Sequence, residues 1–217
     1  MRFRTAIVLT IVFALSSALV GTTLVVSKVL TRATRGQLES DLARQSAAFA
    51  DMLRYRKSLH RAETRMLADE PRLKAVVATD DVTQAPVRGI VLELRRALRC
   101  DLLVITDRDG RVIADSAHED AEGALLGDNQ VLSAALSHGE SDDLWLDENI
   151  VYQVYGRRIA FGSSTVGAVV TGYKIDDALA ESLSHHLGAD LVLFHDRKAI
   201  AASKGLSLLK GDLPPDW

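Results

Sequence analysis

Two stretches of this chain, one in the middle and one near the end, carry the same sequence pattern. Residues 100–108 read CDLLVITDR, and residues 189–197 read ADLVLFHDR. Leucine or isoleucine recurs at helical spacing before each stretch, and the pattern Ile-Ala-x-Ser follows each one. Such a repeat limits the possible folds, because each copy has to form the same local unit. We expect a helix followed by a β-hairpin, used twice.

The second copy is shorter than the first. The first unit extends from Cys100 to a last expected strand that ends at Lys174, whereas 28 residues follow Ala189. We therefore expect the second unit to lack its final strands, as in a fragment, a truncated gene product or a decayed relative. An unfinished sheet exposes an open edge.

An uncharged segment lies near the N-terminus. Residues 5–27 contain no charged side chain, and at ~1.5 Å per residue a helix of this length crosses the hydrocarbon core of a bilayer. We interpret it as a transmembrane helix. The alternative is a cleaved signal peptide, with Arg2 and Arg4 as its basic end and residues 16–18 as the cleavage site. The apolar run continues to Val26, past that site, which favours the anchor.

Charge is distributed unevenly along the chain. Residues 1–35 carry five of the 26 basic side chains and no acidic one, which leaves 21 bases against 29 acids in the remainder. Basic residues lie on both sides of the expected transmembrane helix, so their distribution does not indicate which end of the helix is inside the cell. The acidic remainder and the single cysteine favour residues 1–4 inside the cell and the bulk outside. Nucleic-acid binding needs a basic face, so we expect no such partner.

Residues 28–70 favour one long helix, because they contain one glycine and no proline before Pro71. A narrow apolar stripe runs along it at seven-residue spacing. Two interpretations stay open: a homodimer seam that carries a signal toward the membrane, or a stripe packed on the chain's own sheet. The stripe consists of Leu38, Leu42, Phe49, Met52, Leu59 and Met66.

Beyond Pro71 the sequence alternates between helical and strand patterns. We expect an α+β fold in which helices gather on an antiparallel sheet, and Trp145 lies on a further short strand. The expected elements are a short helix over 72–78, a helix ending near Arg99, a hairpin over 102–115, a helix over 129–138, and strands over 150–161 and 165–174.

The segments LLVITDRDGRVIADS at 102–116 and VGAVVTGY at 166–173, after an anchor and a long helix, resemble a double-Cache sensor domain. Domains of this type are found outside the membrane in two-component kinases and related receptors. The resemblance covers most of residues 36–203. It implies two PAS-like antiparallel units, with a small ligand in the membrane-distal one. The second hairpin departs from the pattern, because Asp196-Arg197-Lys198 replaces the Asp-x-Asp-Gly turn.

We expect five segments, and no output domain up to residue 217, although receptors of this type normally have one. The segments are a cytoplasmic N-terminus at 1–4, the transmembrane helix at 5–27, the long helix at 28–70, the membrane-distal Cache unit at 71–176, and the incomplete membrane-proximal unit at 177–217.

Candidate ligand-binding residues are the aromatic and basic side chains of the later strands, because a pocket needs a polar anchor against an apolar wall. We select Trp145, Tyr152, Arg158 and Tyr173. Alternation places Tyr152 and Arg158 on one face of their strand, but not which face lines a pocket. The alternative is that all four belong to the core or the sheet surface. The Arg-x-Trp pattern of one amino-acid-binding group is not matched, so no ligand class is predicted.

Other chemical motifs are weak. Asp107 and Asp109 beside Gly110 could open a calcium loop, but a hairpin turn explains them better. His185 and His186 are helix neighbours that point apart, and Cys100 reads as a buried, inert thiol. We expect no metal and no cofactor.

The sequence therefore predicts a sensor domain of a signalling receptor, such as a histidine kinase, in the bacterial inner (cytoplasmic) membrane with most of the chain periplasmic. It would bind an unidentified small molecule, form a homodimer through the long helix, and not be an enzyme. The main alternative is an anchored structural or adaptor protein that binds protein partners through its helical stripe. An enzyme is the least supported option, because no catalytic constellation can be assembled.

Overall fold

The computed structural model describes residues 43–79, 84–126 and 129–209. The chain divides into two compact units, residues 1–51 and 52–217. Residues 43–51 of the first unit are helical, and the strands belong to the second unit. Across the described ranges, no helix has the length and apolar character needed to span a bilayer. The expected transmembrane segment at 5–27 lies outside them.

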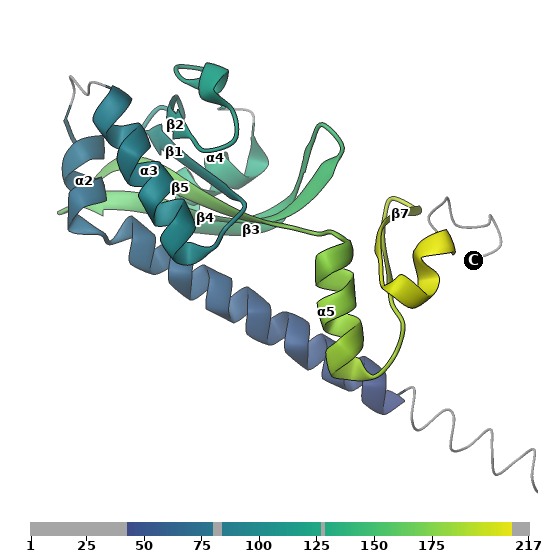
Figure 1. Cartoon of the computed structure of the whole chain (residues 1–217). Coiled ribbons are helices and arrows are strands. Elements are labelled where there is room, and N and C mark those ends of the chain that lie inside the picture. The colour runs from purple at the N-terminus through teal and green to yellow at the C-terminus, as the bar shows by residue number, and fades with distance from the viewer. Residues whose placement is uncertain (1–42, 80–83, 127–128, 210–217) are drawn as a thin grey trace, which may run out of the picture. The chain divides into compact units, whose positions relative to one another are not determined.

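A five-stranded antiparallel sheet forms the centre of the second unit (Figure 1). Its strand order is β2-β1-β5-β4-β3, so that β1 pairs with β5 across 60 to 70 residues of sequence. The predicted antiparallel sheet is therefore confirmed. The strands are β1 (Leu102–Asp107), β2 (Val112–Asp115), β3 (Glu140–Asp147), β4 (Ile150–Phe161) and β5 (Ser164–Lys174).

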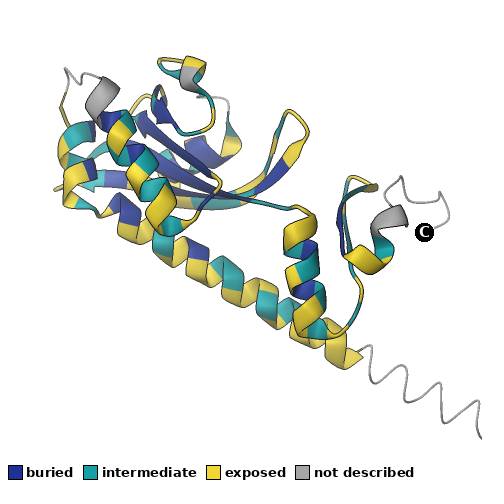
Figure 2. Ribbon diagram, in the orientation of Figure 1, coloured by how far each residue is buried: buried dark blue, intermediate teal, exposed yellow. Residues whose placement is uncertain are grey.

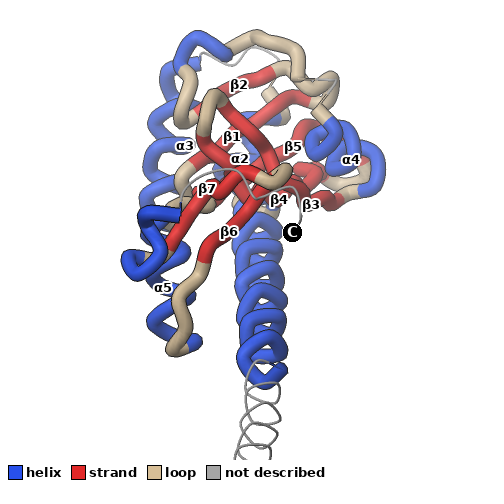
Figure 3. Tube along the Cα trace, turned by 90° about the vertical axis from the view of Figure 1, so that its right-hand side faces the viewer, coloured by secondary structure: helices blue, strands red, loops and turns tan. Residues whose placement is uncertain are grey.

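Helices cover the two faces of this sheet (Figure 3). Residues 52–68, α2 (Pro71–Val77) and α3 (Gln84–Leu98) lie on one face, which we call the helix face. The other face, called the α4 face, is covered by α4 (Gln130–His138). Figure 2 shows that buried residues concentrate on the strands and on the helix sides that contact them. Alternation along each strand supplies both faces with apolar side chains.

Local signals explain the ends of these elements. The side chain of Asn129 accepts hydrogen bonds from the backbone N–H groups of Val131 and Leu132, and Gly139 ends α4 with φ 95°. Asp107 Oδ1 accepts from the N–H groups of Asp109 at 2.9 Å and Arg111 at 2.8 Å, which closes the β1–β2 turn. That carboxylate oxygen serves the hairpin turn, as expected.

The second copy of the repeat forms α5 (Asp177–Leu187), β6 (Val192–His195), β7 (Lys198–Ala202) and a short 3₁₀ helix (Lys204–Leu209). The two strands pair as a separate antiparallel hairpin. Ser116 and Ser203, which the repeat aligns, both accept a backbone N–H at the start of their hairpins, from Leu103 at 2.8 Å and Leu191 at 3.1 Å. The predicted repeat of helix and hairpin is confirmed.

Candidate functional site

The α4 face contains a cluster of apolar side chains from all the central strands. Val104, Val154 and Val170 are each at most 1% exposed, and Leu132 and Ala135 of α4 pack over them. The cluster forms an apolar wall under α4, and a small-molecule site needs such a wall together with a few polar groups. It is the first candidate for the binding site.

Two of the four predicted site residues meet on this face. Tyr152 is 4% exposed within the cluster, and Trp145 lies directly opposite it in the β3–β4 pairing and packs against the same cluster. Arg158 alternates to the same side of β4 but is exposed, and its backbone N–H donates to the Gly139 carbonyl at 3.0 Å. Tyr173 pairs with Gln153 and lies on the helix face. These four residues therefore do not form one constellation.

A further polar group on the α4 face is Thr106, which sequence reasoning did not select. It is 0% exposed, and its hydroxyl has no hydrogen-bond partner within the described part of the chain. Its strand neighbours Val112 and Ala168 belong to the α4-face cluster, so alternation directs its side chain to that face. The available sequence signal was that Thr106, a hydroxyl residue, directly follows the apolar run 102–105.

One end of the α4 face is acidic. His118 lies between two carboxylates, 3.6 Å from Asp115 and 3.4 Å from Asp147, and so links the loop after β2 to the end of β3. Burial, followed by Asp147 and other nearby carboxylates, raises the pKa of the Tyr152 hydroxyl. Tyr152 therefore stays neutral at physiological pH and can donate a hydrogen bond.

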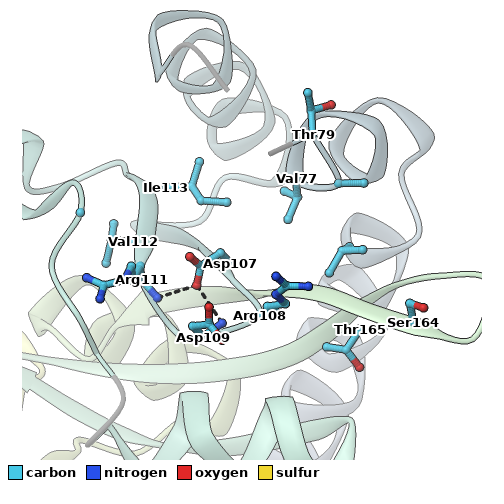
Figure 4. A pocket seen from close by; sticks show the side chains of 13 residues that line it. Val77, Thr79, Asp107, Arg108, Asp109, Arg111, Val112, Ile113, Ser164 and Thr165 are labelled. Atoms are coloured by element: carbon cyan, nitrogen blue, oxygen red, sulfur yellow. Dashed lines mark hydrogen bonds between the residues drawn. The ribbon is translucent and has the colours of Figure 1, made fainter. Parts of the chain in front are cut away.

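A second candidate is a pocket of about 400 Å³ at the end of α2, the β1–β2 turn and the start of β5 (Figure 4). Val77 and Ile113 line its apolar side, and Arg108 and Thr165 line its polar side. A third hollow of about 660 Å³ lies between the β3–β4 turn and the β6–β7 hairpin. Both volumes are within the range of small-molecule sites.

Among the described residues, no group of three or more His, Cys, Asp or Glu side chains is arranged to hold a metal ion. Cys100 is free and buried, and burial raises the pKa of its thiol to about 11. The thiol is therefore protonated and unreactive at neutral pH, in agreement with the inert interpretation.

The sequence matches a known family of sensor domains. Residues 35–212 match a double-Cache family, dCache_3, described as a double sensory domain of two-component sensor kinases. The chain belongs to this double-Cache family. No curated protein sequence matches the chain closely enough to count as a relative.

Solved structures of other sensor domains have a similar fold. The sensor domain of the V. cholerae histidine kinase DctB has a TM-score of 0.61 at 12% identity, and the match covers 85% of this chain and 73% of that one. The ligand-binding domain of the Campylobacter jejuni chemoreceptor Tlp3, in complex with 4-methylisoleucine, has a TM-score of 0.60 at 16% identity and covers 82% and 75%. At these identities the likeness shows the Cache fold alone.

Two tyrosines of the helix face differ in whether their hydroxyl has a hydrogen-bond partner. The Tyr173 hydroxyl donates to Glu63 Oε2 at 2.8 Å, whereas the Tyr155 hydroxyl is buried with no partner among the described residues. We expect Tyr173→Phe to lower the free energy of unfolding by about 1.5 kcal/mol, because a bond to a charged group is lost. Tyr155→Phe should leave it unchanged or raise it, because it removes an unsatisfied hydroxyl. Urea unfolding of the two variants measures the difference, and equal losses would contradict it.

Proposed function

We propose that this chain is the small-molecule sensor domain of a membrane-anchored signalling receptor such as a histidine kinase, and that it is a binding domain without catalytic activity. The match of residues 35–212 to the double sensory domain family carries this proposal. The bulk of the chain would lie on the outer side of the bacterial inner membrane, and residues 5–27 would anchor it.

We place the ligand on the α4 face of the membrane-distal unit. Two observations support this location: the unsatisfied hydroxyl of Thr106, and the exposed residue Arg158 beside the end of α4, both of which pair with Ala168 of β5. Trp145 and Tyr152 lie toward the other end of this face. The complex of the Tlp3 domain with 4-methylisoleucine adds small amino acids to the compounds worth testing. A ligand acts as a signal when it prefers one arrangement of the domain over another.

The test is thermal unfolding of the full chain in detergent micelles against a panel of small acids, amines and amino acids. A compound at one hundred times its dissociation constant adds ~2.7 kcal/mol to the folded state and raises the melting temperature. Arg158→Ala should reduce the rise if the ligand lies on the α4 face. Arg108→Ala, in the pocket of Figure 4, is the matched control. A cooperative melt with no rise from any compound would instead favour the adaptor function.

We further propose that residues 52–68 contact a second copy of the chain. Leu59 is 41% exposed and Met66 is 72% exposed, whereas His60, Thr64 and Leu67 face the chain's own sheet. Packing of this stripe on the same chain is therefore wrong for Leu59 and Met66, and a partner helix would cover them. Analytical ultracentrifugation of the Leu59→Glu, Met66→Glu double variant should show a loss of dimer. An unchanged molecular mass would reject this seam.

A further inference from the structure

A buried histidine connects the long helix to the sheet. His60 is 8% exposed, and its ring stacks on Tyr173 with the ring centroids 3.6 Å apart. Its Nδ1 lies 2.9 Å from Glu63 Oε2, the same oxygen that accepts the Tyr173 hydroxyl. One turn further along, the hydroxyls of Thr64 and Thr171 meet at 2.6 Å. The helix and β5 are thus joined through an imidazole, a carboxylate and three hydroxyls.

The second ring nitrogen of His60 is unsatisfied. Nε2 is buried with no hydrogen-bond partner in the described part of the chain, and so is the hydroxyl of Tyr155, whose ring centroid lies 5.7 Å from that of His60. The arrangement fits a neutral imidazole that donates from Nδ1 to Glu63. A protonated ring would bring a second N–H donor and a net charge into the same enclosed space.

The groups around the His60 ring shift its pKa in opposite directions. Burial and, less strongly, Arg56 oppose the protonated imidazole, whereas Glu63 and the stacked Tyr173 ring favour it. Burial is the largest effect, and the pKa of His60 lies below its ordinary value. The titratable and charged groups around this cluster include Glu63, Arg56 and Arg61 on the helix, Asp142 on β3, Tyr155 on β4, Tyr173 on β5, and Cys100 ahead of β1.

The direction of the pH effect follows from this lowered pKa. A group that binds its proton less readily when folded gives its full stabilisation above its unfolded pKa, about 6.5 for histidine. That stabilisation is lost as the pH falls below this value toward the folded pKa. The ring is enclosed between the helix and the sheet, and Nε2 is shielded from water in the folded state.

We propose that His60 makes the contact between residues 52–68 and the sheet responsive to protons, so that acidification weakens this contact and the proton becomes a second input to the domain. The weakening does not require any other ligand. Its use as an input rests on the proposed sensor function, because the same helix would transmit the signal.

Hydrogen exchange of the full chain in detergent micelles, measured between pH 7.5 and 5.5, tests the proposal. Each pH is compared with His60→Phe, which keeps an aromatic ring in the stack but does not titrate. We expect the ratio of wild-type to variant exchange in residues 52–68 to rise as the pH falls, while the ratio in α3 stays constant. The control His138→Gln, at an exposed position on α4, should keep the wild-type response.

An exchange profile whose pH dependence is the same in His60→Phe and in the wild type would overturn the proposal. If the variant does not fold, NMR titration of His60 in the wild type decides: its midpoint must lie below about 6.5, the value for an unperturbed histidine, and a midpoint at or above this value overturns the proposal. The absence of any ligand-induced melting shift would count against the sensor function but not against this pH response, so the two failures are distinguishable.

Discussion

Gly167→Ala is expected to lower the free energy of unfolding by about 3 kcal/mol, one of the two largest losses we predict. Gly167 lies on β5, where it pairs with Asp107 of β1 and Ile159 of β4. A Cβ at this position would overlap the Thr106 carbonyl oxygen and lie 2.8 Å from Val77 Cγ1. The overlap is with the backbone of a neighbouring strand, so relief requires β1 and β5 to move apart in the centre of the sheet.

Gly89→Ala provides the matched control for this experiment. Gly89 lies within α3 and is exposed, and a Cβ added there would meet no atom outside its own helix backbone within 4 Å. The same substitution should there raise the free energy of unfolding by about 0.5–1 kcal/mol, because alanine loses less conformational entropy in a helix. Urea unfolding of both variants gives the comparison. A loss below about 0.5 kcal/mol for Gly167→Ala would show that the strands are not packed this closely.

Features set by neighbouring residues were predictable from the sequence. The α4 helix begins and ends where Asn129 and Gly139 indicated, and β4 occupies the predicted range 150–161. The β1–β2 turn depends on Asp107 and Gly110, whose φ is 81°. Each of these signals operates over a few residues, so no knowledge of the tertiary fold was needed.

Features set by contacts between distant residues were not predictable. The sequence indicated a short strand at Trp145, but β3 extends over Glu140–Asp147. Its sequence ESDDLWLD carries charges that hide this strand character, and as an edge strand it tolerates them. Tyr173 was grouped with Tyr152, yet the pairing of β4 with β5 places it on the opposite face. The contact of Tyr173 with Glu63 joins residues 110 positions apart, and neither sequence context indicates the other.

Leu103→Ala is the other substitution with a large expected effect. Leu103 is 0% exposed, and it lies on the helix face among the side chains that hold Leu67 of the long helix and Val87 of α3. Truncation to alanine removes apolar contacts and leaves a cavity, at a cost of about 3 kcal/mol. The backbone hydrogen bonds of β1 at this position should be retained, because the N–H and carbonyl of Leu103 keep their bonds to Ser116.

The functional consequence of Leu103→Ala depends on which face holds the ligand. Because Leu103 belongs to the helix face, a ligand on the α4 face should bind the folded variant with nearly unchanged affinity, although the melting temperature falls by roughly 6–12 °C. Leu125→Ala, at a position that is 60% exposed, should change stability by less than about 0.5 kcal/mol. Calorimetric melting and ligand titration of these two variants separate the two faces. A large loss of affinity with Leu103→Ala would place the ligand on the helix face, beside His60 and Tyr173.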